Sequence, residues 1–175
     1  MIYVDRDCCT KTGDPPILRL FSPWTTAVRL DIFHYMRRFN KGLRGESHPL
    51  YQQFCSELSC CIFEWNSNDL DHLREAKLSQ LQRSHPDQNI SQNDVSASLT
   101  STELVQHCRR RTRGPDETRQ RIQMLLEKMW DLEDNTGKRL INPNAMNNIW
   151  TEQQRHSNAS RMYQELICTP RMAPL

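Results

Sequence analysis

Three residues near the N-terminus are of the types that support metal-dependent chemistry on nucleic acids. Asp5 follows the short apolar run at 2–4, and Asp31 begins a D-x-x-H motif that ends at His34. A carboxylate at the end of a buried strand suits Mg²⁺, which takes oxygen ligands, and two such ions can cleave a phosphodiester bond. Asp5 is therefore a candidate catalytic residue and magnesium ligand. The structural alternatives are an Asp that ends a strand in a turn, and a helix-capping Asp beside a partly buried His.

A second chemical signal is a run of six arginines within 13 residues, interrupted by a Gly-Pro pair: Arg109, Arg110, Arg111, Arg113, Arg119 and Arg121. The guanidinium group suits bidentate phosphate contacts, and such contacts make binding salt-dependent. The run is a candidate site for weak, non-specific DNA binding. The alternative is a solvated, positively charged helix end that the helix dipole stabilises, with nearby Asp and Glu residues diluting the field.

Cysteines and two glutamates are weaker candidates for metal chemistry. The chain has seven Cys, and none of their spacings matches the C-x2–4-C pattern of zinc sites. A composite zinc site of Cys8 or Cys9 with His34 stays open, beside the alternative of buried free thiols. Glu64 and Glu152 could each supply a further carboxylate, but solvated helix positions are the simpler interpretation.

The elements that position these residues are mostly helical. Apolar patterning predicts two short strands followed by about five helices, a mainly α fold with a small β element (α+β). The strands are expected at 2–4 and 27–33, and a polar linker at 84–99. Helices are expected at 34–41, 48–64, 70–81, 100–108, 116–134 and from 143, with Asp69 capping one of them, a capping box at Thr100 and Glu103, and Asn142 capping the last.

Bulk composition limits the compartment and the partners. The hydrophobic fraction is 37% and the net charge is +2, distributed as +3, −4 and +3 over residues 1–49, 50–99 and 100–175. No run approaches the ~20 apolar residues that a membrane span needs, and no secretory signal core follows Met1. We expect an intracellular protein, nuclear or cytoplasmic, with reduced thiols and no membrane partner.

The order of several segments resembles the central part of RNase H-like transposase-derived proteins, of the hAT and Mutator type with a D-x-x-H motif, that are found in fish and other animals. These segments include YVDRDCC, LDIFHYMRRFNKG, SHPLYQQFCSELSCCIFEW, HCRRRTRG and IWTEQQRH. The resemblance implies a partial RNase H-like strand-loop-strand-helix segment at 1–45, a helical insertion at 46–157 and a divergent tail at 158–175. It also implies that Asp5 is a vestigial second catalytic carboxylate and that Asp31 and His34 form the D-x-x-H pair.

The resemblance leads to an expectation of catalytic incompleteness. The other two catalytic carboxylates of such transposases are expected upstream of Met1 and beyond the helical block, so Mg²⁺ would be needed only in an assembled site. The first hypothesis is a transposase-derived fragment with weak DNA or protein binding. The alternatives are a small helical protein-interaction module and a metal-dependent nuclease completed in trans. For the interaction module, the four tryptophans Trp24, Trp65, Trp130 and Trp150 are either anchors or core residues.

Overall fold

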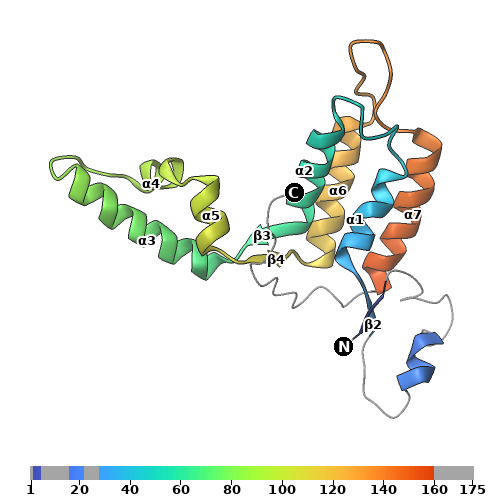
Figure 1. Cartoon of the computed structure of the whole chain (residues 1–175), viewed down its shortest axis with the longest axis horizontal. Coiled ribbons are helices and arrows are strands. Elements are labelled where there is room, and N and C mark those ends of the chain that lie inside the picture. The colour runs from blue at the N-terminus through green and yellow to red at the C-terminus, as the bar shows by residue number, and fades with distance from the viewer. Residues whose placement is uncertain (1, 5–15, 22–27, 160–175) are drawn as a thin grey trace. The chain divides into compact units, whose positions relative to one another are not determined.

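The computed structural model describes residues 2–4, 16–21 and 28–159 (Figure 1). The described residues form a mainly α structure with two small two-stranded sheets, which confirms the predicted class. Its strands are β1 (Ile2–Val4), β2 (Val28–Leu30), β3 (Phe63–Trp65) and β4 (Arg110–Thr112). Its helices are η1 (Pro16–Phe21, 3-10), α1 (Ile32–Asn40), α2 (Tyr51–Ile62), α3 (Ser67–Ser84), α4 (Gln92–Ser98), α5 (Ser101–His107), α6 (Pro115–Met129) and α7 (Pro143–Ala159). None of the helices in these ranges is both long and apolar enough to span a membrane.

The chain divides into two compact units. The first, which we call the bundle unit, contains the described residues up to Ile62 and those from Arg113 to Ala159. The second, which we call the inserted unit, covers Phe63–Thr112, between the two halves of the first. Each unit has its own two-stranded sheet, because β1 pairs with β2 and β3 pairs with β4.

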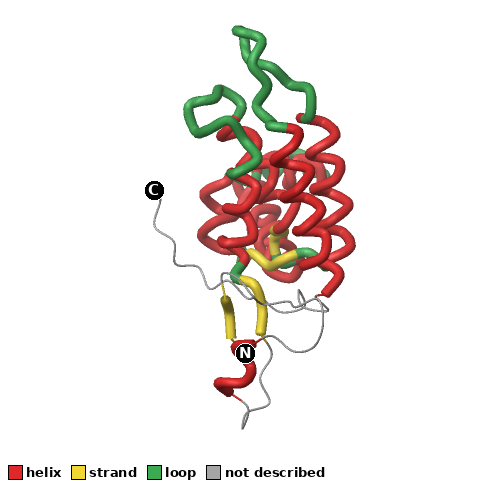
Figure 2. Tube along the Cα trace, turned by 90° about the vertical axis from the view of Figure 1, so that its right-hand side faces the viewer, coloured by secondary structure: helices red, strands yellow, loops and turns green. Residues whose placement is uncertain are grey.

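The bundle unit is built from α1, α2, α6 and α7 (Figure 2). Helix α2 packs against α6, and α7 packs against both α1 and α6. Aromatic and aliphatic side chains fill the space between them, including Tyr35, Phe39, Phe54, Leu58, Ile62, Ile122, Leu125, Leu126, Met129, Met146 and Trp150. The helix predicted at 116–134 is α6, which ends at Met129. Its apolar residues Ile122, Leu125, Leu126 and Met129 are buried along one face, whereas Met124 is 60% exposed.

Backbone contacts join the loop that follows α1 to the loop that precedes α7. Leu43 pairs with Ile141 as an isolated antiparallel bridge, and the Asn142 N–H donates to the Gly42 carbonyl at 2.9 Å. Buried His48 strengthens the connection, because its Nε2 lies 3.0 Å from the Lys138 carbonyl and its Nδ1 accepts the Leu50 N–H at 3.2 Å. These roles require the neutral ring with the proton on Nε2.

Strands β1 and β2 form a parallel pair, with Tyr3 opposite Arg29. Both strands were predicted, but the second is shorter than the predicted 27–33. It ends at Leu30 because Asp31 starts helix α1, accepting hydrogen bonds from the backbone N–H groups of Phe33 and His34. The N-cap Asp31 is still extended, and the backbone becomes helical at the next residue, so the strand cannot continue.

The inserted unit combines the antiparallel β3–β4 ribbon with α3, α4 and α5. Several predictions for this region need correction. The helix predicted at 48–64 ends at Ile62, so Glu64 lies on strand β3. Helix α3 is capped by Asn66, with Asp69 in its first turn. The stretch 84–99 contains α4, because Ser91 forms a capping box and Val95 is buried in the unit.

Candidate nucleic-acid and protein interfaces

The D-x-x-H motif forms a compact polar contact at the start of α1. Asp31 Oδ1 accepts N–H groups from Phe33 at 2.9 Å and His34 at 3.1 Å, and it lies 3.2 Å from His34 Nδ1. The two side chains are 34% and 45% exposed. The structure therefore brings Asp31 and His34 together, and the geometry is that of a helix cap to which the imidazole is tethered.

The candidate metal residues are only partly within the described chain. Asp5, Cys8 and Cys9 lie outside the described residues, so the magnesium and zinc predictions stay predictions. Within the described ranges, no three His, Cys, Asp or Glu side chains are close enough to hold a metal ion. Glu64 pairs with Arg111, and Glu152 is exposed on α7.

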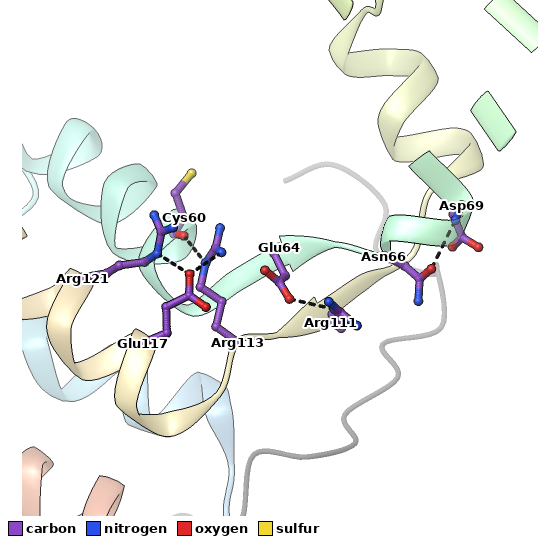
Figure 3. A network of polar contacts seen from close by, with 8 residues as sticks. All are labelled: Cys60, Glu64, Asn66, Asp69, Arg111, Arg113, Glu117 and Arg121. Atoms are coloured by element: carbon purple, nitrogen blue, oxygen red, sulfur yellow. Dashed lines mark hydrogen bonds and ion pairs between the residues drawn. The ribbon is translucent and has the colours of Figure 1, made fainter. Parts of the chain in front are cut away.

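Two arginines of the predicted DNA site form ion pairs in the inserted unit. Arg109 binds Asp69 in a fork, with Nε to Oδ2 at 2.8 Å and Nη2 to Oδ1 at 2.9 Å, and its backbone N–H donates to the same carboxylate. These hydrogen bonds lower the pKa of Asp69 to about 2. Arg111 Nε lies 2.8 Å from Glu64 Oε1, its cross-strand neighbour (Figure 3).

Arg110 occupies a different environment on the same strand. It lies opposite Trp65 in the ribbon register, and its guanidinium carbon is 4.9 Å from the Trp65 ring centroid and 6.0 Å from that of Phe63. An arginine over an aromatic face is stabilised by the ring quadrupole. The predicted anchor Trp65 therefore serves as a platform for Arg110 in this structure.

The remaining three arginines of the run belong to the bundle unit. Arg113 Nη1 and Arg121 Nε both donate to Glu117 Oε1, at 3.0 and 2.8 Å (Figure 3). Arg121 is the largest cause of the lowered pKa of the Glu117 carboxyl. Arg119 pairs with Asp116 at 2.6 Å. All of these are pairs three or four residues apart at the N-terminal end of α6.

Five of the six arginines thus contact a carboxylate, and the sixth is stacked on aromatic rings. Pairing reduces the net positive potential that a phosphate would meet at the run. The partners on α6 were detectable as neighbours in the sequence. The partners Asp69 and Glu64 lie 40 and 47 residues from their arginines, so sequence patterning could not identify them.

The inserted unit also exposes an apolar surface that sequence analysis missed. Only Val95 and Cys108 are buried apolar residues there, and helix α3 buries no side chain. Leucines on one face of α3 are only half-buried, namely Leu70, Leu73, Leu78 and Leu81. Val105 on α5 is 61% exposed. Sequence patterning showed the apolar positions but not how little of them the unit covers.

The other predicted anchors have different surroundings. Trp150 is in the core of the bundle unit, 6.1 Å from Phe39 between ring centroids, and its Nε1 donates to Gln123 Oε1 at 2.7 Å. Trp130 is half-buried at the end of α6, and Trp24 lies outside the described residues.

Compared with known protein families, curated proteins and solved structures, the chain shows no match.

Proposed function

We propose that the chain is a transposase-derived helical protein of the nucleus or cytoplasm that binds a partner protein through its inserted unit. The transposase origin is supported by the ordered segments of the sequence, in which the apolar run at 2–4 and Asp5 precede the D-x-x-H motif of Asp31 and His34. We further propose that it does not cleave DNA alone, because two-metal cleavage needs several carboxylates at one site.

The observation that carries protein binding is the thin core of the inserted unit. The unit covers Phe63–Thr112, yet its only buried apolar side chains are Val95 and Cys108. Small units usually need further burial, a metal or a partner to become stable. Covering half-exposed leucines and Val105 with a partner would remove apolar surface from water, at about 25 cal/mol per Å².

Polar contacts hold this apolar surface in one geometry. Lys77 on α3 pairs with Glu103 on α5 at 2.7 Å, and Glu103 also closes the capping box with Thr100. Arg109, which directly precedes β4, donates backbone and side-chain hydrogen bonds to Asp69 on α3. A surface that is ordered before binding loses less conformational entropy when the partner docks.

The charge of the inserted unit favours a protein partner over a polyanion. Residues 63–112 contain seven acidic and six basic side chains, so their net charge is −1. Three of the acidic residues are Asp69, Glu64 and Glu103, each of which already pairs with a basic residue. The partly exposed leucines of α3 and the exposed Val105 of α5 suit an amphipathic helix of the partner, whose apolar side chains dock at helical spacing.

A crosslinking experiment with matched positions tests this proposal. A photoreactive amino acid at Val105, in the full chain expressed in cells, should crosslink a specific polypeptide, whereas the same group at the adjacent polar Gln106 should not. With that polypeptide purified, Val105→Glu should weaken binding about fivefold or more. Val105 is largely exposed in the free chain, and the variant would lose the apolar burial that this valine gains in the complex. Gln106→Glu adds the same charge and should leave affinity unchanged. Equal crosslinking or equal weakening at both positions would refute the proposal.

A further inference from the structure

Three basic side chains at the C-terminal end of α1 differ from the six arginines of the run. Arg37, Lys41 and Arg44 are all exposed. In the part of the chain that the structure describes, none of the three makes an ion pair or a side-chain hydrogen bond. Lys41 is the C-cap of α1 and uses only its backbone N–H, and the Arg44 N–H donates to Leu140 at 2.9 Å. Their charges therefore face solvent without compensation.

The residues around these three cations do not neutralise them. Ile32 to Leu50 contains four basic residues and a single acidic one, Glu46. On the adjacent loop, Asp131 and Glu133 pair with Arg139, and Asp134 accepts hydrogen bonds from Thr136 and the Lys138 backbone, so none of these carboxylates forms an ion pair with the three cations.

The neighbouring helix adds to the positive potential. Helix α7 lies beside α1 and begins next to Gly42, whose carbonyl accepts the Asn142 N–H. The first acidic residue of α7 is Glu152, more than two turns into the helix. Its N-terminal turns instead expose Asn144 and Asn147. The N-terminal end of α7 carries a partial positive charge, which offsets the partial negative charge at the C-terminal end of α1, where Arg37 and Lys41 lie.

An exposed aromatic ring shares the helix face of Arg37 and Lys41. Phe33 is 46% exposed, and it precedes Arg37 by four residues, as Arg37 precedes Lys41. Residues four apart lie on the same face of a helix. Aromatic rings next to basic side chains are the combination that binds single-stranded nucleic acid, because bases stack on the ring while cations contact the phosphates.

We propose that Phe33, Arg37, Lys41 and Arg44, the α1 basic surface, bind a single strand of nucleic acid. The three cations contact successive phosphates and Phe33 stacks on an unpaired base. This function lies beyond the binding of a protein by the inserted unit. It also places nucleic-acid contact away from the arginine run, where five of the six side chains are already paired with carboxylates.

Fluorescence anisotropy with a labelled mixed-sequence oligonucleotide and the full chain provides the test. For single strands, log affinity falls with log salt by about 0.7 per phosphate contact, so three contacts predict about a 20-fold loss between 50 and 200 mM salt. The triple variant Arg37→Gln, Lys41→Gln, Arg44→Gln should lose most of the affinity and nearly all of this salt dependence.

The matched control removes the same three charges from the arginine run. The variant Arg111→Gln, Arg119→Gln, Arg121→Gln should retain affinity within about twofold, since those guanidinium groups are already paired. Thermal melting of both variants checks that each remains folded. Equal loss in the two triple variants, or no binding of any nucleic acid by the wild type, would overturn the proposal.

Two further arms separate nucleic acid from other polyanions and test the aromatic contact. Phe33→Ala should weaken binding of the single strand about fivefold or more and leave binding of the matching duplex unchanged, because duplex bases are already stacked. Equal affinity for poly-glutamate would overturn the assignment to nucleic acid. A charge-conserving variant, Arg37→Lys with Arg44→Lys, should retain binding, because the phosphate contacts depend on charge. The Val105→Glu variant should bind the oligonucleotide as the wild type does.

Discussion

Replacing Gly42 by alanine should measure how tightly α7 approaches the end of α1. A Cβ atom at position 42 would lie 2.7 Å from Met146 Cε, 3.0 Å from Met146 Sδ and 3.2 Å from Ile149 Cδ1. Favourable carbon contacts lie at about 3.5–4.0 Å, so the methyl group intrudes by roughly 1 Å. Met146 is fully buried and cannot swing into solvent.

The cost follows from how the core can respond. Overpacking a core costs about 1–3 kcal/mol, and the flexible thioether of Met146 can absorb part of the strain. We therefore expect Gly42→Ala to lower the free energy of unfolding by about 1.5 kcal/mol, in the lower half of that range. Urea denaturation followed by circular dichroism at 222 nm gives this difference, with the slope against urea unchanged.

Other glycines supply controls for the same chemical change. A Cβ atom at Gly114 would have no neighbour within 4 Å. Gly114→Ala should therefore change the free energy of unfolding by about zero, because the penalty at this N-cap and the entropy gain from replacing glycine are of similar size and oppose each other. Gly45→Ala meets no neighbour but imposes strain at φ 133°. The double variant Gly42→Ala, Met146→Leu should lose less free energy of unfolding than the sum of the losses of the two single variants. If Gly42→Ala and Gly114→Ala change the free energy of unfolding equally, the close approach of α7 does not exclude a Cβ atom at position 42.

Two further predictions concern titrating groups. Because Arg109 holds the pKa of Asp69 at about 2 instead of the usual 3.8, this contact stabilises the inserted unit fully above about pH 4 and the stabilisation disappears as pH falls through 2. Asp69→Asn should remove it at neutral pH and speed amide exchange in the first turns of α3; unchanged exchange would contradict this. Burial raises the pKa of the Cys61 thiol to about 11, so its alkylation at pH 8 should be about 100-fold slower than in urea, measured by peptide mass spectrometry. Similar rates in the two conditions would show that the thiol is not shielded.

Local signals in the sequence were sufficient for many of the elements. The apolar spacing of α6, the Gly114–Pro115 break before it, the Thr100–Glu103 capping box and the Asn142 cap of α7 all occur as predicted. Each depends on residues within about four positions of one another, which is the range of helix capping and periodicity. The Asp31 cap was weighed as the structural alternative for the D-x-x-H motif, and it too is a local contact.

The strands of the ribbon could not be predicted in this way. Phe63–Trp65 and Arg110–Thr112 each contain three residues, and their partners are separated by the whole inserted unit. A strand of three residues has too short an alternation to be distinguished from the end of a helix. Helix α4 was missed for a related reason, because Val95 is the only apolar anchor in a polar stretch.

What the sequence determined by itself is the helical class, the presence of most helices and the identity of the charged residues. Only the tertiary structure decided which of those charges remain available. Asp69 and Glu64 compensate Arg109 and Arg111 across 40 and 47 residues, whereas no carboxylate in the described chain pairs with Arg37. The physical reason is that the potential a ligand meets depends on distances between charges in space, and a linear sequence does not contain those distances.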